Sequence, residues 1–216
     1  MGVDPVQALD RLIEGNRRFM ADAPGDPDRF NAERRGQLVS GQAPFAAILS
    51  CADSRVPAEV VFDQGLGDLF VVRVAGNIAA PSQMGSLEFA AEKLGVRLVV
   101  VLGHSCCGAI DATVEALREQ VEAPTEGLRK ILDRVRPAVE PLLAESLEPP
   151  DLSREAVRAN VRMAARMLRE ESPILARLRA EQGLAVVGAE YDLPTGAVRF
   201  FDGLTDAGEL PPADQR

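Results

Sequence analysis

The chain has 216 residues, 46% of them hydrophobic, so it can bury a core, and it carries 24 Lys and Arg against 33 Asp and Glu. These values exclude intrinsic disorder and a small disulfide scaffold, and the net charge of -9 argues against a nucleic-acid partner. No apolar run approaches the roughly 18 residues of a membrane span, and the N-terminus has acidic residues where a signal peptide is apolar. We therefore expect a cytoplasmic protein that binds neither nucleic acid nor membrane.

The N-terminal part is predicted to be helical. Residues 4–20 place apolar side chains at helical intervals with charged residues between them. Residues 21–42 are polar and rich in Pro, Gly, Asp and Arg, which predicts a loop with one more short helix.

Three short apolar runs follow, at 46–51, 68–75 and 96–104. Each has the length of a strand and is almost continuously apolar, which is typical of parallel strands buried on both faces. Residues 81–95 predict a helix that Gly95 closes, so the second and third strands form a right-handed crossover unit. Residues 107–119 predict another helix.

The remainder of the chain is helical and then extended. Residues 124–181 are rich in Leu and Arg, and we expect helices broken at Pro137, Pro141, Pro149–Pro150 and Pro173. Within residues 153–181 acidic residues accompany the arginines, which favours a solvated helix surface over an anion-binding face. Residues 183–201 hold two apolar runs around a turn, which predicts a hairpin. The whole pattern predicts an α/β fold with a mainly parallel sheet and flanking helices.

All three cysteines and the single histidine of the chain fall within two short motifs. Residues 51–55, CADSR, follow the first predicted strand, and residues 103–108, GHSCCG, follow the third. Sites in open α/β sheets form beyond the carboxyl ends of the strands, so these two motifs can meet there. With one histidine, a metal site built on several imidazoles is excluded.

Two thiolates and one imidazole suit Zn²⁺, and three protein ligands leave a coordination position open for catalysis. Cys51, His104 and Cys107 are the predicted ligands. A fourth ligand would be Cys106 or Asp53, but adjacent cysteines rarely reach one ion, and we expect Cys106 to serve packing. A cysteine nucleophile paired with His104 is the alternative chemistry.

These motifs, C-x-D-x-R and V-x-G-H-S-x-C-G, together with GDLFVVRVAGN and GSLEFA, resemble the β-class carbonic anhydrases from about Gln42 to Ala116. The resemblance implies a zinc enzyme, with one Zn²⁺ per chain, that reversibly hydrates carbon dioxide to bicarbonate and a proton. The attacking group would be a zinc-bound hydroxide. It also implies dimers in which N-terminal helices embrace the partner, or dimers of dimers.

By the same resemblance, residues 1–216 form a single domain. It would comprise an N-terminal helical arm (1–42), a catalytic core (43–120), a helical segment (121–182) and C-terminal strands with a tail (183–216).

The resemblance also assigns residues around the metal. Arg55 would hold the carboxylate of Asp53, which would accept a hydrogen bond from the zinc-bound hydroxide; in an inactive state Asp53 would itself bind zinc. Substrate-binding residues are expected on both sides of the pocket: Gln42 as a donor with the Gly108 amide close by, Phe70 and Ala75 on the apolar side, and Phe89 from the partner subunit.

Further expectations follow from the charge of the two thiolate ligands and from positions at which the sequence departs from the pattern of the family. Two thiolates cancel the charge of Zn²⁺, so activity should rise toward alkaline pH. Arg73 matches an arginine of a regulatory bicarbonate site, but Ile48 replaces its tryptophan, so that inhibition should be absent. Tyr191 is expected to be structural, leaving buffer or water to carry protons.

Two alternatives stay open. Ala75 makes the pocket slightly roomier than the valine of many relatives, so a carbonyl sulfide or carbon disulfide hydrolase on the same scaffold is the alternative activity. A non-catalytic zinc-binding module is the alternative without an enzyme.

Overall fold

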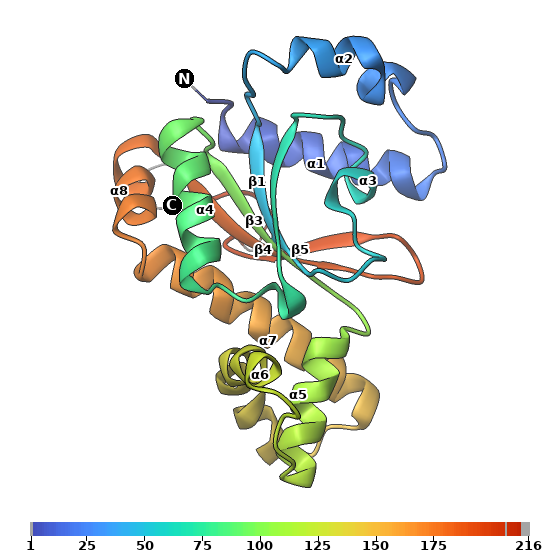
Figure 1. Ribbon diagram of the computed structural model, residues 1–216, viewed down its shortest axis with the longest axis vertical. Helices are drawn as coiled ribbons and strands as arrows, with labels where there is room; N and C mark the ends of the chain where they lie inside the picture. The colour runs from blue at the N-terminus through green and yellow to red at the C-terminus, as the bar shows by residue number, and fades with distance from the viewer. Residues whose placement is uncertain (1, 206, 213–216) are drawn as a thin grey trace.

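The computed structural model describes residues 2–205 and 207–212, and in this range a five-stranded sheet of order β2-β1-β3-β4-β5 forms the centre of the molecule (Figure 1). The strands are β1 (Ala46–Ser50), β2 (Leu69–Arg73), β3 (Leu98–His104), β4 (Ala185–Tyr191) and β5 (Val198–Asp202). Neighbouring strands from β2 to β4 are parallel, and only β5 is antiparallel. The mainly parallel sheet, the strands predicted at 46–51, 68–75 and 96–104, and the C-terminal hairpin are therefore confirmed. The expectation that all three strands are buried on both faces is wrong for β2, which is mostly half-buried because it lies at the edge of the sheet.

Helices cover both faces of this sheet. They are α1 (Pro5–Met20), α2 (Ala32–Gln37), α3 (Ala58–Val61), α4 (Pro81–Lys93), α5 (Gly108–Glu119), α6 (Glu126–Val139), α7 (Pro149–Glu170) and α8 (Pro173–Gln182), with short 3₁₀ turns η1 (Pro27–Phe30), η2 (Ala75–Asn77) and η3 (Glu140–Ala144). α1 and α3 share one core cluster with the sheet, whereas α4, α7 and α8 share the other. None of these helices is long and apolar enough to cross a membrane.

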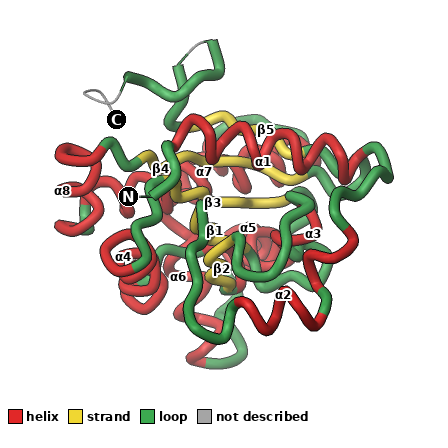
Figure 2. The backbone as a smooth tube through the Cα atoms, turned by 90° about the horizontal axis from the view of Figure 1, so that it is seen from above, coloured by secondary structure: helices red, strands yellow, loops and turns green. Residues whose placement is uncertain are grey.

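α1 begins where its sequence predicts and packs on the sheet of its own chain. The Asp4 side chain accepts a hydrogen bond from the Val6 amide, and Pro5 occupies the first turn. The apolar stripe puts Ala8 and Leu12 at 0% exposure against the sheet, and Figure 2 shows α1 lying alongside the strands. That the N-terminal arm embraces a partner subunit stays a prediction, and so does the single-domain organisation. Residues 206 and 213–216 of the predicted tail lie outside the described residues.

The expected helix break at Pro137 is wrong. Pro137 lies inside α6, which continues to Val139. It falls in the last turn, so its missing N–H removes only one intrahelical hydrogen bond shortly before the helix ends. The other prolines act as expected, because Pro141 opens η3, Pro149 and Pro150 open α7, and Pro173 opens α8.

The strand order creates the position of the site. From β1 the chain passes to β2 through α3 on one face, and from β2 it crosses over β1 to β3 through α4 on the other face. The connections that leave β1 and β3 therefore diverge at their carboxyl ends, which is where sites form in open α/β sheets. α5, α6 and the first half of α7 pack beyond this edge (Figure 1), around a third core cluster that contains Cys51 and Cys107.

Candidate metal centre

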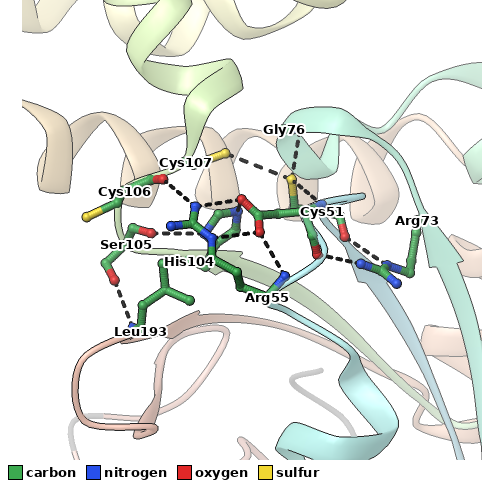
Figure 3. Close-up of polar contacts among 10 residues, drawn as sticks. Cys51, Arg55, Arg73, Gly76, His104, Ser105, Cys106, Cys107 and Leu193 are labelled. Carbon is green, nitrogen blue, oxygen red and sulfur yellow. Dashed lines mark hydrogen bonds and ion pairs between the residues drawn. The ribbon is translucent and has the colours of Figure 1, made fainter.

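The structure brings Cys51, His104 and Cys107 together. Cys51 follows β1, His104 is the last residue of β3, and Cys107 is the N-cap of α5. One ligand atom from each lies within 4.8 Å of the others, and the two sulfurs are 4.0 Å apart (Figure 3). All three are buried, with exposed fractions of 4%, 0% and 1%. The convergence that the sequence predicted at the two strand ends is thus present.

One nitrogen of His104 is left without a partner. Its Nδ1 lies 2.9 Å from the Ser105 carbonyl, which can only accept, so Nδ1 donates there and, in the neutral imidazole, Nε2 keeps its lone pair. No hydrogen-bond partner reaches this buried Nε2 among the residues that the structure describes. A buried polar atom without a partner costs about 1–3 kcal/mol. This nitrogen therefore has the position and the tautomer of a metal ligand.

The two sulfurs form a coupled pair. Cys51 Sγ accepts hydrogen bonds from the amides of Asp53 and Gly76, each at 3.4 Å. The hydrogen bond from Cys107 lowers the pKa of the Cys51 thiol to about 4, although burial opposes this shift. The pKa of Cys107 is raised in turn, because Cys51 accepts that bond and its own burial disfavours a second charge. Zinc binds the deprotonated sulfur, so a cation bound to both cysteines must displace the proton that the two sulfurs share.

The donor set fits zinc. Buried sulfur and imidazole ligands are soft to borderline and suit Zn²⁺, whereas Mg²⁺ and Ca²⁺ require oxygen ligands. The unpartnered His104 Nε2 beside two sulfurs is the observation on which this fit rests.

Asp53 lies next to these ligands, and Arg55 holds both of its carboxylate oxygens. Arg55 Nε donates to Oδ1 at 2.9 Å and Nη2 donates to Oδ2 at 2.7 Å. The hydrogen bonds from Arg55 hold the pKa of Asp53 far below its usual range. Oδ2 also lies 3.8 Å from His104 Nε2. The carboxylate is therefore ionised and oriented beside the nitrogen that lacks a partner.

The expectation that Cys106 serves packing is wrong, because its side chain is exposed. Its backbone is left-handed, with φ 54°, so the chain turns there and the side chain points away from Cys107 (Figure 3). The Cys106 carbonyl accepts a hydrogen bond from Arg55 Nη2 at 3.1 Å. Cys106 thus contributes its backbone, not its sulfur, to the site.

Two further residues, whose roles here the sequence did not reveal, fix the ligands. The Ser105 amide donates to the Tyr191 carbonyl, and the Ser105 hydroxyl oxygen accepts from the Leu193 amide, both at 2.9 Å. Arg73 donates to the Cys51 carbonyl at 3.0 Å and to the Asp53 carbonyl at 2.5 Å. Only tertiary contacts show these roles, because nothing in the spacing of the motifs predicts them.

The predicted substrate residues divide into two groups. Ala75 precedes Gly76, whose amide binds Cys51, and Gly108 follows Cys107, so both lie at the cluster. An added Cβ at Gly108 would meet no atom within 4 Å, which leaves the space over the start of α5 open.

Gln42 and Phe70 lie near the amino ends of β1 and β2, away from the metal cluster at the carboxyl ends. Phe70 pairs with Ala47, and Gln42 precedes β1. At about 3.3 Å per residue, Ala47 is about 13 Å along the strand from Cys51. Phe89 is 51% exposed, and its ring centroid lies 6.3 Å from that of Phe70. The structure does not bring this second group to the cluster of the same chain.

Tyr191 is structural, as expected. It is 5% exposed, its ring centroid lies 6.4 Å from that of Phe19, and burial raises its pKa. A buried phenol with a raised pKa is a poor proton carrier near neutrality.

Comparison with known proteins identifies the family. A family model described as carbonic anhydrase matches residues 46–198. The chain is 42% identical over 211 residues to a carbonic anhydrase of Mycolicibacterium smegmatis, covering 96% of this chain and 98% of the relative. It is 39% identical over 206 residues to carbonic anhydrase 2 of Mycobacterium tuberculosis, covering 95% and 97%.

Solved structures similar to this one indicate the same family. A β-carbonic anhydrase of Aspergillus fumigatus superposes with a TM-score of 0.72 at 26% identity, covering 93% of this chain and 92% of that one. A Coccomyxa β-carbonic anhydrase superposes with a TM-score of 0.69 at 27% identity, covering 96% and 94%. The fold, the Cys–His–Cys cluster and these matches lead to one conclusion: the chain belongs to the β-carbonic anhydrase family.

Proposed function

We propose that this chain reversibly hydrates carbon dioxide at a zinc ion held by Cys51, His104 and Cys107, one ion per chain. The observation that carries the proposal is the unpartnered, buried His104 Nε2 within reach of two sulfurs. Bound there, zinc would supply a Lewis acid that brings the pKa of a coordinated water toward neutrality. The family membership makes carbon dioxide and bicarbonate the substrates that this chemistry serves.

Asp53 and Arg55 are the proposed catalytic residues. Because Arg55 keeps Asp53 ionised, the carboxylate can accept a hydrogen bond from a group bound beside His104 but has no proton to give. The bidentate grip also fixes the direction of the accepting lone pairs, so Asp53 can orient a nucleophile toward the substrate carbon.

The substrate pocket is proposed to need two copies of the chain. Ala75 and Gly108 lie at the cluster, whereas Gln42, Phe70 and Phe89 lie at the other end of the sheet. The second group can reach a cluster only by facing that of another copy. This arrangement supports a homo-oligomer, a dimer or a dimer of dimers, in which Gln42 donates to a substrate oxygen and the two phenylalanines supply apolar walls.

The test combines metal analysis with stopped-flow hydration of carbon dioxide. We expect one zinc per chain, turnover that rises from neutral to alkaline pH, and loss of turnover when a chelator removes the metal. Zinc-free protein with full turnover would contradict the proposal. Cytoplasmic location and insensitivity to regulatory bicarbonate stay predictions.

The same assay separates the alternatives. No observation in the structure favours hydrolysis of carbonyl sulfide or carbon disulfide, and the relatives are named carbonic anhydrases. Turnover of carbonyl sulfide that exceeds carbon dioxide hydration would support the hydrolase. A bound zinc without turnover of either substrate would indicate the non-catalytic module.

A further inference from the structure

Asn160 connects α7 to the backbone around the metal cluster. It is 1% exposed, and its Nδ2 donates to the Gly76 carbonyl at 2.8 Å. Its neighbours in α7 belong to different cores, Val157 to the cluster around Cys51 and Val161 to the sheet face. Asn160 therefore lies where α7 passes the carboxyl edge of the sheet.

Gly76 is bonded on both of its sides. Its carbonyl accepts from Asn160, and its amide donates to Cys51 Sγ at 3.4 Å. The backbone between these two bonds is left-handed, with φ 69° and ψ 20°. Any rotation of the Gly76 backbone that breaks one of these bonds therefore disturbs the other.

The turn around Gly76 is strained and needs such support. Asn77 follows with φ 42°, so two consecutive residues are left-handed, and a non-glycine residue in that region costs of the order of 1–3 kcal/mol. Within the turn, the Asn77 amide donates to the Val74 carbonyl at 3.0 Å. The bond from Asn160 joins this turn to a long helix, which makes the turn rigid.

The side chains of Asn160 and Asn77 also carry a cost to the stability of the fold. In the described part of the chain, neither Asn160 Oδ1 nor Asn77 Nδ2 has a hydrogen-bond partner, and both are buried. Buried polar atoms without partners oppose folding. An apolar side chain at this position would remove the unpartnered Oδ1 but would leave the Gly76 carbonyl without its donor.

We propose that Asn160 is a positioning residue that holds the Gly76 amide against Cys51 Sγ and thereby strengthens zinc binding. The inference rests on the proposed function, because it concerns the same metal cluster. Groups that hydrogen-bond directly to a metal ligand, as the Gly76 amide does, typically contribute about 10–100-fold to metal affinity. Asn160 acts one bond further out, through Gly76, so its contribution should lie at or below the lower end of that range. Through its bond to the sulfur, the amide also limits where that sulfur can lie.

The experiment compares Asn160→Leu with a matched control. Asn16 is also a buried asparagine, 3% exposed, and it donates from α1 to the Val61 and Gly196 carbonyls on the other side of the sheet. We expect Asn160→Leu to weaken zinc binding severalfold, up to about 10-fold, in competition with a chromogenic chelator. Asn16→Leu should leave zinc affinity within about twofold of wild type, although both variants lose stability.

Cobalt substitution gives a second readout. The thiolate-to-cobalt charge-transfer band should shift in Asn160→Leu and stay unchanged in Asn16→Leu. If Asn160→Leu does not fold, Asn160→Ser provides the same comparison with a shorter side chain. Wild-type zinc affinity and spectrum in the Asn160 variants would overturn the inference alone. Failure of the wild type itself to bind zinc would overturn the proposed function, and this inference with it.

Discussion

Asp53 and His104 show how single residues divide the work of the site. His104 Nδ1 donates to the Ser105 carbonyl, which leaves Nε2 available. Both carboxylate oxygens of Asp53 accept hydrogen bonds from Arg55. The metal position therefore has an unpartnered imidazole nitrogen on one side and a fixed negative acceptor on the other. Removing the acceptor should affect turnover without affecting the ligands.

Asp53→Asn tests this separation. The amide cannot accept the grip of Arg55 on both atoms, so we expect kcat/KM for hydration to fall by about 10²-fold, the scale of one lost orienting group. Zinc content should stay at one per chain, because Asp53 is not among the three ligands. Equal losses of zinc and turnover would show instead that Asp53 holds the metal.

The cysteines offer a second comparison at this scale. Cys51→Ser replaces a buried sulfur of the cluster, whereas Cys106→Ser changes an exposed side chain next to Cys107. We expect the first variant to lose most of its zinc, as measured by metal analysis after dialysis, and the second to keep it. If Cys106→Ser also loses zinc, the sulfur of Cys106 takes part in binding.

At the scale of elements, much of the fold could be predicted from the sequence. β1, β3 and β4 are buried along their whole length and read as continuous apolar runs, so they can be recognised without their neighbours. The break at Pro137 was wrong because the cost of a proline depends on where the helix ends. The exposure of Cys106 was missed because a left-handed turn between two cysteines leaves no periodic signal.

The candidate ligands could be predicted as well, since they follow predicted strands. The contacts that support them could not. Asn160 lies on a helix far along the chain from Gly76, and Arg73 reaches the Cys51 carbonyl from the neighbouring strand. Such pairs depend on tertiary packing, which no local spacing encodes.

The packing of β3 against α7 predicts the effect of Gly103→Ala. A Cβ at Gly103 would lie 2.6 Å from Val161 Cγ2 and 3.1 Å from Val157 Cγ1. This overpacking should lower the free energy of unfolding by about 1–3 kcal/mol, measured with urea at saturating zinc. Gly85→Ala is the control, because its Cβ meets nothing within 4 Å in α4. It should stabilise the protein by about 0.5–1 kcal/mol. Equal stability of both variants would contradict the packing.

Asp63 joins the N-terminal arm to the core. Burial by itself would raise its pKa, but hydrogen bonds from Arg29 and Arg18 outweigh that effect and lower it. Arg18 lies 2.5 Å and Arg29 2.6 Å from the carboxylate, which is 8% exposed. A lowered pKa stabilises the folded state above the ordinary value of about 4, and this stabilisation is lost as the pH falls below it.

Asp63→Asn should therefore lower the free energy of unfolding by about 2 kcal/mol at pH near 7. The difference from wild type should shrink as the pH falls from about 4 through the lowered pKa of Asp63, below which the wild-type carboxylate is protonated in the folded state as well. Urea unfolding across this pH range measures both. A difference that does not change with pH would show that shape, not charge, makes the contact.

At the scale of the whole molecule, the two halves of the proposed pocket lie at opposite ends of the parallel strands, one at the carboxyl ends and the other at the amino ends. Phe70 and Phe89 form an aromatic pair beside the edge strand β2, whose side chains are mostly half-buried. Gln42 lines a cavity of about 620 Å³ at the same end. On the proposed function, one chain carries the three metal ligands and, separately, the substrate contacts for another copy.

Phe89→Arg tests whether the two sets meet. A charge in an apolar interface should weaken association by about 2 kcal/mol or more, or about 30-fold, so sedimentation velocity should show a shift toward monomer. Hydration should fall as well, although Phe89 lies far from the cluster of its own chain, while zinc content stays at one per chain. Val121, which is 58% exposed beyond α5, provides the control, since Val121→Arg should change neither property. Unchanged mass and turnover in Phe89→Arg would mean that each chain completes its pocket alone, from residues other than Gln42, Phe70 and Phe89.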